Sequence, residues 1–150
     1  MRISREQMLM EVAYTASKRG TCGRLAVGAI IARDSRPVSL GYVGAPRGCP
    51  HCSPTVCPDL RAPCTRTVHA EANAILSAED HRIDIHGADM FVTNSPCLEC
   101  AMMIGENGIR RVYYDQEYRI PDGVHHLLER RVEVYRILMN GMIRQIEPIV

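Results

Sequence analysis

The sequence predicts an α/β protein in which helices cover both faces of a mainly parallel sheet. After residue 67, short apolar segments of strand character alternate with segments that repeat apolar residues at helical spacing. Such alternation is typical of parallel strands joined by crossover helices, and parallel sheets need cover on both faces. Before residue 67, two apolar segments flank a turn at residues 34–37, which predicts an antiparallel hairpin.

The N-terminal elements have clear boundaries. Ser4 and Gln7 form a capping-box pair, apolar residues recur at helical spacing after them, and Gly20 ends the predicted helix. A continuous apolar run over residues 25–32 predicts a buried strand, and residues 38–43 predict its hairpin partner.

Residues 44–66 form a cysteine-rich insertion that contains five prolines and four cysteines. A loop of this length without regular structure is uncommon unless it is functional or held in place. We expect its cysteines to hold it.

The rest of the chain supplies the alternating elements. Helices are predicted over residues 68–79, 97–106 and 121–130, and strands over residues 90–93, 111–114 and 132–135. Residues 132–150 form the last strand and a C-terminal tail. The tail either packs against a neighbouring copy or folds back on its own sheet through its apolar residues Ile137, Leu138, Met139, Met142 and Ile143.

Length and composition favour a single domain over residues 1–150. The chain is 46% hydrophobic and 23% charged, the balance of an ordinary soluble globular protein. Its net charge of +1 gives no bulk attraction for a polyanion, so we expect no nucleic-acid partner. No apolar run reaches the roughly 20 residues of a membrane helix, and Glu6 lies where a signal peptide would be apolar. We therefore expect a cytoplasmic protein without a membrane partner.

Seven cysteines point to metal binding, because thiols stay reduced in the cytosol and an odd number does not close a disulfide framework. His69, Cys97 and Cys100 stand where predicted strands meet predicted helices, and they provide three zinc ligands. Three ligands leave a fourth position for water, as in catalytic sites. Glu71 can carry protons to and from that water. A CxxC pair alone is more often a structural zinc or redox motif, but together these residues predict a catalytic Zn²⁺, one per chain.

The remaining cysteines suggest a second, structural Zn²⁺, which needs four ligands. The predicted ligands are Cys22, Cys52, Cys57 and Cys64, with Cys49 and His51 in reserve. The alternative is that some of these cysteines are plain buried residues. A zinc ribbon built from Cys49, Cys52, Cys97 and Cys100 would instead bind nucleic acid or protein, but 44 residues separate its two halves.

These motifs carry a family resemblance. Residues 69–71 (His-Ala-Glu) and 96–100 (Pro-Cys-Leu-Glu-Cys) match the pattern of the zinc nucleobase deaminases. Residues 22–29 (Cys-Gly-Arg-Leu-Ala-Val-Gly-Ala), 41–48 (Gly-Tyr-Val-Gly-Ala-Pro-Arg-Gly) and the cysteine-rich insertion extend the match from Thr21 to Tyr118. Over this region the chain resembles the deoxycytidylate (dCMP) deaminases of the cytidine and deoxycytidylate deaminase family.

The resemblance implies a fold and an activity. The fold would be the three-layer α/β/α sandwich of the cytidine deaminase superfamily, with a five-stranded mixed sheet. The reaction would be hydrolytic deamination of dCMP to dUMP and ammonia, which supplies dUMP for thymidylate synthesis. His69, Cys97 and Cys100 would hold the zinc, while Glu71 would move a proton to ring atom N3 and then to the leaving amine. Relatives also bind a structural zinc through positions like Cys22 and Cys52, and most are homohexamers controlled by dCTP and dTTP.

Substrate contacts follow less directly. The resemblance places pocket residues at Ala70, Asn73, Ser95, Tyr118 and Val43. Relatives usually have Asn where this chain has Val43, which offers no side-chain hydrogen bond for effector control or nucleotide selection. Candidate ligands of a 5′-phosphate are Arg24, Arg47 and Arg82. The enzymatic alternatives are a deaminase of CMP, dCTP or a modified dCMP and, with weaker support, a tRNA adenosine deaminase.

Overall fold

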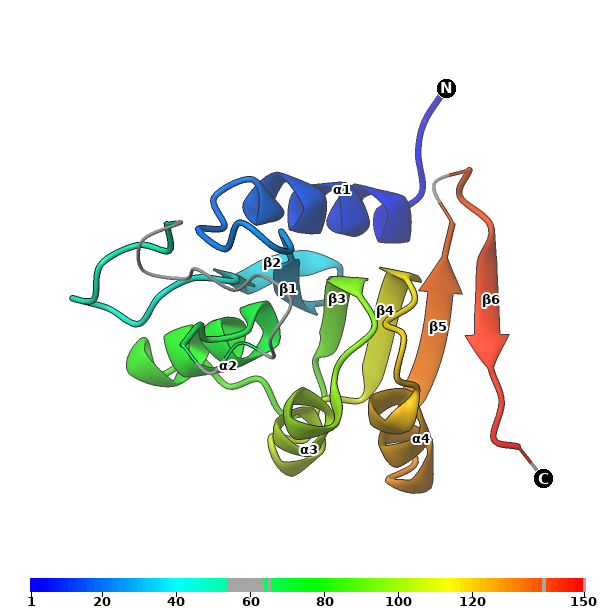
Figure 1. Cartoon of the computed structure of the whole chain (residues 1–150). Helices are drawn as coiled ribbons and strands as arrows, with labels where there is room; N and C mark the ends of the chain where they lie inside the picture. The colour runs from blue at the N-terminus through cyan, green and yellow to red at the C-terminus, as the bar shows by residue number, and fades with distance from the viewer. Residues whose placement is uncertain (54–63, 65, 139, 150) are drawn as a thin grey trace.

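The computed structural model describes residues 1–53, 64, 66–138 and 140–149 of the chain (Figure 1). Within these residues four helices and six strands alternate along the sequence. In chain order they are α1 (Arg5–Ser17), β1 (Gly28–Arg33), β2 (Arg36–Tyr42), α2 (Ala70–Asp80), β3 (Asp89–Asn94), α3 (Leu98–Glu106), β4 (Arg111–Gln116), α4 (Asp122–Glu129), β5 (Glu133–Ile137) and β6 (Ile143–Ile146). None of the described helices has both the length and the apolarity needed to cross a lipid bilayer.

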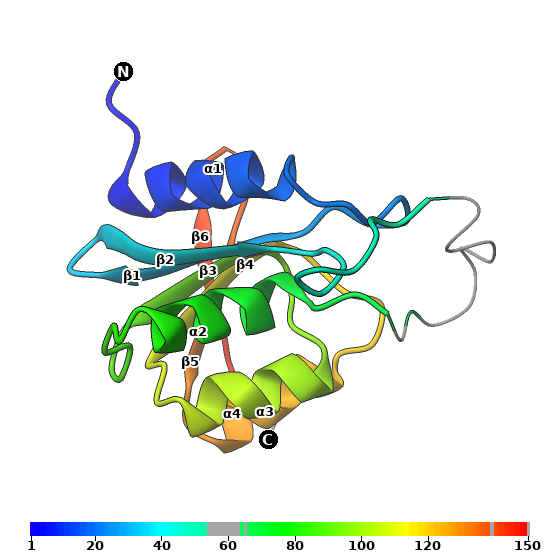
Figure 2. The same cartoon turned by 90° about the vertical axis from the view of Figure 1, so that its left-hand side faces the viewer.

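The strands form one mixed sheet in the order β2-β1-β3-β4-β5-β6. Strands β3, β4 and β5 are parallel, as predicted for the region after residue 67, whereas β1 is antiparallel to both β2 and β3. Helix α1 covers one face of the sheet, and α2, α3 and α4 cover the other (Figure 2). The predicted α/β/α sandwich is therefore confirmed.

The predicted strand count of five is wrong, because the tail adds a sixth strand. After a turn in which Gly141 has a φ of 85°, β6 pairs antiparallel with β5. The free edge of β5 thereby gains backbone hydrogen-bond partners that it would otherwise find only in water. Of the two fates predicted for the tail, the structure shows the return to its own sheet.

The N-terminal boundaries follow local signals. The Ser4 side chain accepts a hydrogen bond from the Gln7 amide and the Gln7 side chain accepts one from the Ser4 amide, so the predicted capping box is confirmed. The hairpin turn places Asp34 and Ser35 at φ values of 50° and 62°, as in a type I′ turn. Strand β1 is shorter than predicted: Leu25 is 42% exposed, because the ladder pairing of β1 begins only at Gly28.

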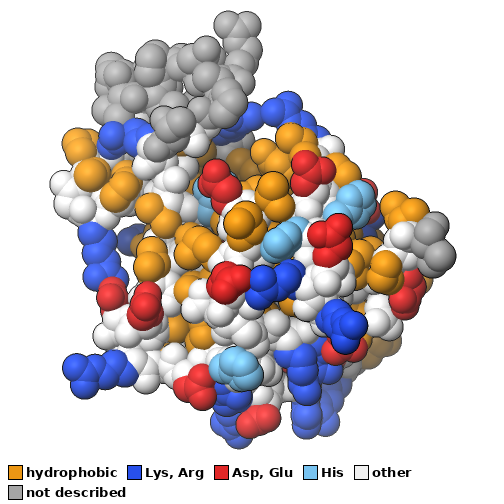
Figure 3. All heavy atoms as spheres, turned by 90° about the horizontal axis from the view of Figure 1, so that it is seen from below, with side chains coloured by type: hydrophobic (Ala, Val, Ile, Leu, Met, Phe, Trp, Pro, Cys, Tyr) orange, Lys and Arg blue, Asp and Glu red, His pale blue; other side chains and the backbone are white. Residues whose placement is uncertain are grey.

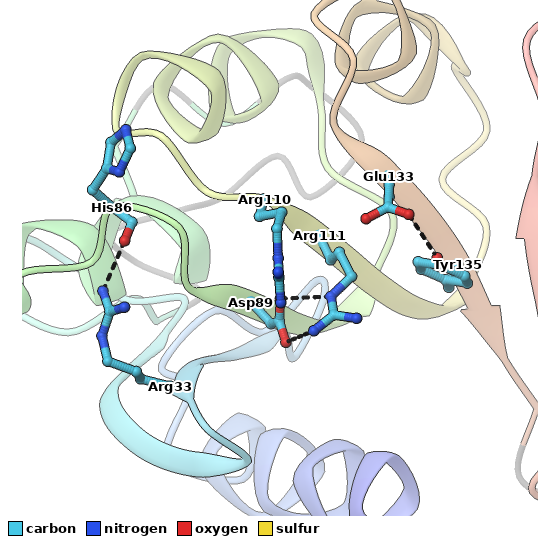
Figure 4. A network of polar contacts seen from close by, with 7 residues as sticks. All are labelled: Arg33, His86, Asp89, Arg110, Arg111, Glu133 and Tyr135. Carbon is cyan, nitrogen blue, oxygen red and sulfur yellow. Dashed lines mark hydrogen bonds and ion pairs between the residues drawn. The ribbon is translucent and has the colours of Figure 1, made fainter.

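Several polar contacts lie where the parallel strands begin, and one of them is an ion pair that joins β3 to β4 (Figure 4). Arg111 of β4 donates two hydrogen bonds to the Asp89 carboxylate of β3, at 2.9 and 3.0 Å. Nearby, Arg33 of β1 donates to the carbonyl oxygen of His86, and Tyr135 of β5 donates to Glu133. The opposite ends of β3 and β4 lead into α3 and α4, and the chemistry-bearing residues gather there.

Candidate active site

The three predicted metal ligands come from the first turns of two neighbouring helices. His69 is the N-cap residue of α2, Cys97 is the N-cap residue of α3, and Cys100 lies in the first turn of α3. Neither N-cap side chain makes the usual capping hydrogen bond, although the Cys97 sulfur accepts a hydrogen bond from Cys100. Both side chains are therefore available to each other and to an ion.

The ligand atoms lie close enough to share one ion. Nδ1 of His69 is 3.5 Å from Sγ of Cys97 and 3.4 Å from Sγ of Cys100, and all three ligand atoms lie within 4.8 Å of one another. Tetrahedral zinc with bonds of about 2.0–2.3 Å needs ligand atoms roughly 3.5 Å apart. Two sulfur atoms and one imidazole nitrogen are also the donors that zinc prefers. The residues fit a zinc ion with one open coordination position.

Hydrogen bonding inside this group separates the proton affinities of its members. The hydrogen bond from Cys100 lowers the pKa of Cys97 to about 4, and the same contact raises the pKa of Cys100. The hydrogen bond with Cys97 raises the pKa of His69 to about 9. In the absence of a metal, His69 and Cys100 therefore hold their protons more tightly than usual, and Cys97 holds its proton less tightly. Because a metal binds the deprotonated forms, its binding displaces the protons of His69 and Cys100.

Glu71 supplies a buried carboxyl beside these ligands. It occupies the first turn of α2, is 4% exposed, and its side chain interacts with Cys100. Burial raises the pKa of the Glu71 carboxyl, because a desolvated carboxylate is less stable than the neutral acid. A carboxyl with a raised pKa holds a proton more readily than an exposed carboxyl does, as a group that accepts and returns protons must.

Helix α2 is held against strand β2 by an unusually close contact. A Cβ atom on Gly41 would lie 2.2 Å from the carbonyl oxygen of Ala70, so only glycine fits there. The side-chain nitrogen Nδ2 of Asn73 donates to the carbonyl oxygen of Tyr42 at 2.7 Å, and the Ser39 hydroxyl donates to the Ala74 carbonyl oxygen at 2.7 Å. Asn73, predicted as a substrate contact, thus also fastens α2 to the sheet.

The turn before α3 is fastened by the loop that follows β4. The amide of Ser95 donates to the Gln116 carbonyl at 2.8 Å, and Oγ of Ser95 accepts from the Tyr118 amide at 2.7 Å. A Cβ atom on Gly123 of α4 would lie 2.0 Å from the carbonyl oxygen of Pro96. The structure thus brings Ser95 and Tyr118, both predicted substrate contacts, to the junction that carries Cys97.

The other predicted pocket residues are buried. Ala70 is fully buried between His69 and Glu71, and Val43 is 7% exposed. The Val43 amide donates to the Val27 carbonyl at 3.1 Å, and its own carbonyl accepts from the Thr21 amide at 3.1 Å. Gly41 and Gly123, which sequence reasoning missed, set how closely the helices approach these residues. An isolated glycine in a strand was the one available signal, at Gly41.

The predicted second zinc site stays a prediction. Its ligands Cys22, Cys52 and Cys64 are half-buried, Cys49 and His51 are exposed, and Cys57 lies outside the described residues. Among the described residues, only His69, Cys97 and Cys100 form a group able to hold a metal ion. Cys64 lies 3.2 Å from the Thr67 hydroxyl, and that hydrogen bond lowers the pKa of the Cys64 thiol.

Two of the candidate phosphate ligands lie far from the metal group. Helix α2 has 11 residues and is therefore about 16 Å long, with His69 at its start. Arg82 follows the far end of that helix, and Arg47 forms an exposed ion pair with Asp80, also at the far end, at 3.4 Å. Arg24 lies in the exposed segment before β1.

Comparison with known proteins decides the family. The family model described as the cytidine and deoxycytidylate deaminase zinc-binding region matches residues 3–116. The chain belongs to this deaminase family. Family membership argues against the zinc-ribbon alternative, and in the described structure Cys97 and Cys100 group with His69 and not with Cys49 and Cys52.

Three relatives give the scale of similarity within the deaminase family. ComE operon protein 2 of Bacillus subtilis is 38% identical over 143 residues, covering 95% of this chain and 76% of that protein. The deoxycytidylate deaminase of Mycobacterium phage D29 is 38% identical over 125 residues, covering 75% of this chain and 94% of that protein. The dCMP deaminase of cyanophage S-TIM5, solved in complex with dCMP and dUMP, superposes with a TM-score of 0.82 at 32% identity. That superposition covers 91% of this chain and 99% of the phage chain.

Proposed function

We propose that this protein is a zinc-dependent dCMP deaminase, which hydrolyses dCMP to dUMP and ammonia. The observation that carries the proposal is the group of His69, Cys97 and Cys100 with the buried carboxyl of Glu71 against it. The similarity to a phage dCMP deaminase that binds dCMP and dUMP supports this choice of substrate.

The residues divide the chemistry between them. A zinc ion held by His69, Cys97 and Cys100 would lower the pKa of a water molecule to about 7 and so supply a nucleophile for C4 of the cytosine ring. Glu71 accepts the proton that this water loses, and delivers it to ring atom N3. It would then carry the proton of the hydroxyl group newly added at C4 to the exocyclic amine, so that the C4–N bond breaks, ammonia leaves and a carbonyl forms at C4. The raised pKa of Glu71 suits this role, because the buried carboxyl can hold the proton between transfers.

The test is ammonia release from dCMP by zinc-loaded protein, with CMP, dCTP and cytidine measured alongside. The matched control is Glu71→Gln, which keeps the side-chain shape and the metal ligands but cannot carry a proton. We expect Glu71→Gln to keep its zinc and lose about 10²–10⁴-fold in kcat, the usual contribution of general acid–base catalysis. Zinc-loaded protein that releases no ammonia from dCMP would refute the assignment.

A different cytosine nucleotide is the second candidate substrate. Val43 favours it, because this buried side chain offers no hydrogen bond where relatives usually have Asn. In this case CMP, dCTP or a modified dCMP would be turned over faster than dCMP by the same residues. A tRNA adenosine deaminase is less favoured, since acidic, basic and apolar side chains are interspersed over the face covered by α2, α3 and α4 (Figure 3).

The family resemblance supports four further proposals. First, residues 1–150 act as one deaminase domain. Second, the protein is a cytoplasmic homohexamer that supplies dUMP for thymidylate synthesis. Third, dCTP and dTTP regulate it, and fourth, each chain binds a second zinc. Light scattering, turnover with added dCTP or dTTP, and the zinc content per chain test the last three. A monomer insensitive to both nucleotides, with one zinc, would contradict them.

A further inference from the structure

Arg136 links the last parallel strand to the loop that borders the active site. Its Nε donates to the carbonyl oxygen of Asp115 at 2.9 Å, and its Nη1 donates to the carboxylate of Glu117 at 3.0 Å. Arg136 therefore holds the end of β4 and the start of the β4–α4 loop with a single planar group. Lysine carries all its donors on one nitrogen, so it would not reproduce a contact made by two separate nitrogens of a planar group.

The segment held by Arg136 continues directly to the metal-ligand turn. Gln116 accepts a hydrogen bond from the Ser95 amide, and the Tyr118 amide donates to the Ser95 hydroxyl. Ser95 lies two residues before Cys97. Residues 115–118 thus form a short hydrogen-bonded path from the guanidinium of Arg136 to the start of α3.

The same segment is also held from the opposite face of the sheet. Asp115 is 2% exposed, and its carboxylate accepts a hydrogen bond from the Tyr14 hydroxyl of α1 at 2.5 Å. Arg136 and Tyr14 therefore fix one residue, Asp115, through its carbonyl on one side and its carboxylate on the other. Because the Glu117 partner is 62% exposed, its ion pair with Arg136 contributes little to global stability. Its effect is on where the loop lies.

We propose that Arg136 is a positioning residue, which fixes residues 115–118 as one wall of the substrate pocket. It touches neither the metal ligands nor Glu71, and it acts through Ser95 and Tyr118. The kinetic part of this inference rests on the proposed dCMP deaminase activity, whereas the structural part does not. The experiment therefore needs one readout of each kind.

The variants are Arg136→Gln and Arg136→Lys, with Arg144→Gln as the matched control. Arg144 lies opposite Arg136 in the β5–β6 pairing, and in the described structure it has no hydrogen bond or ion pair with residues 115–118. Amide hydrogen exchange of the peptide over residues 115–121 reports the position of the loop. KM and kcat for dCMP, together with zinc content, report its effect on the site.

We expect Arg136→Gln to speed amide hydrogen exchange in this peptide and to raise KM for dCMP about tenfold. A tenfold change corresponds to the free energy of losing one hydrogen bond to a charged group. We expect kcat and zinc content to stay within about twofold of wild type, because the catalytic group is held by α2 and α3. Arg136→Lys should show a smaller rise in KM, and Arg144→Gln none.

Three results would overturn the inference. Arg136→Gln could show the wild-type rate of amide exchange, or Arg144→Gln could have an effect as large as that of Arg136→Gln. The third is a fall of both kcat and zinc content in Arg136→Gln, which would indicate general destabilisation. If the wild-type protein does not turn over dCMP, the proposed function fails. The exchange of residues 115–121 then still decides whether Arg136 positions the loop.

Discussion

Replacing Gly41 by alanine would test whether β2 sets the position of the catalytic residues. The added Cβ would lie 2.2 Å from the Ala70 carbonyl oxygen and 2.5 Å from the Ala74 nitrogen, whereas ordinary contacts begin at 3.4 Å. The two elements must therefore separate by about 1 Å, and we expect helix α2 to move, carrying both contacted atoms with its rigid backbone. Ala70 lies between His69 and Glu71, so both move with it.

The displacement has two measurable consequences. Overpacking of this kind costs about 1–3 kcal/mol of folding free energy, which urea unfolding would detect. A misplacement of about 1 Å in a catalytic group costs roughly 10²-fold in rate, so kcat/KM for dCMP should fall by that order. Gly23→Ala is the control, because a Cβ at Gly23 meets no atom within 4 Å.

The contrary outcome would also be informative. Strand β2 is at the edge of the sheet and is paired on one side only, with β1. If Gly41→Ala loses stability but keeps wild-type kcat/KM, the edge strand has yielded instead of the helix. The claim that β2 positions His69 and Glu71 would then be refuted.

Other perturbations separate the site from the scaffold. Cys100→Ser should bind zinc at least tenfold more weakly, since a hydroxyl is a poorer zinc ligand than a thiolate. If mass spectrometry shows a full zinc complement in this variant, the ligand assignment is wrong. Asp89→Asn should lower the free energy of unfolding, measured in urea, by about 1–2 kcal/mol, because it weakens the contacts with Arg111. Its kcat should stay at the wild-type value, because Asp89 lies at the end of the sheet opposite the metal group. Burial raises the pKa of Tyr14 to about 12, so the folded protein keeps a proton that the unfolded chain releases from about pH 10. Stability should therefore fall as the pH rises from 10 to 12. The fall should be shallower in Tyr14→Phe but still present, because Tyr113 has a similar raised pKa; an unchanged slope would contradict the burial argument.

The metal group was predictable because its signals are local. His69 and Glu71 are two residues apart, Cys97 and Cys100 are three apart, and each pair begins a helix. The capping box of α1 is equally local, and its two hydrogen bonds are present as predicted. In each case the sequence signal lies within one helical turn, although the metal group itself joins two such turns that are 28 residues apart.

The missed features depend on contacts between distant residues. Strand β6 forms because β5 would otherwise leave a free edge of the sheet. The sequence of residues 143–146 alone does not indicate that such an edge is available. Gly41 must be glycine because helix α2, some thirty residues later in the chain, packs directly against it. Arg136 donates a hydrogen bond to the Asp115 carbonyl oxygen, 21 residues earlier. Apolar periodicity predicts which face of an element is buried, but it does not say which other element covers that face.

Helices α2 and α3 begin at residues of the metal group, whose side chains do not make the usual capping hydrogen bond. At most helix starts a Ser, Thr, Asp or Asn side chain caps a free amide and contributes about 0.5–2 kcal/mol. The His69 and Cys97 side chains make no such hydrogen bond. Replacing either by a good capping residue would make its helix more stable and leave the group one ligand short. The starts of α2 and α3 therefore represent a trade-off between folding stability and activity. A capping residue at either position would raise the free energy of unfolding, but the deaminase would lose a metal ligand.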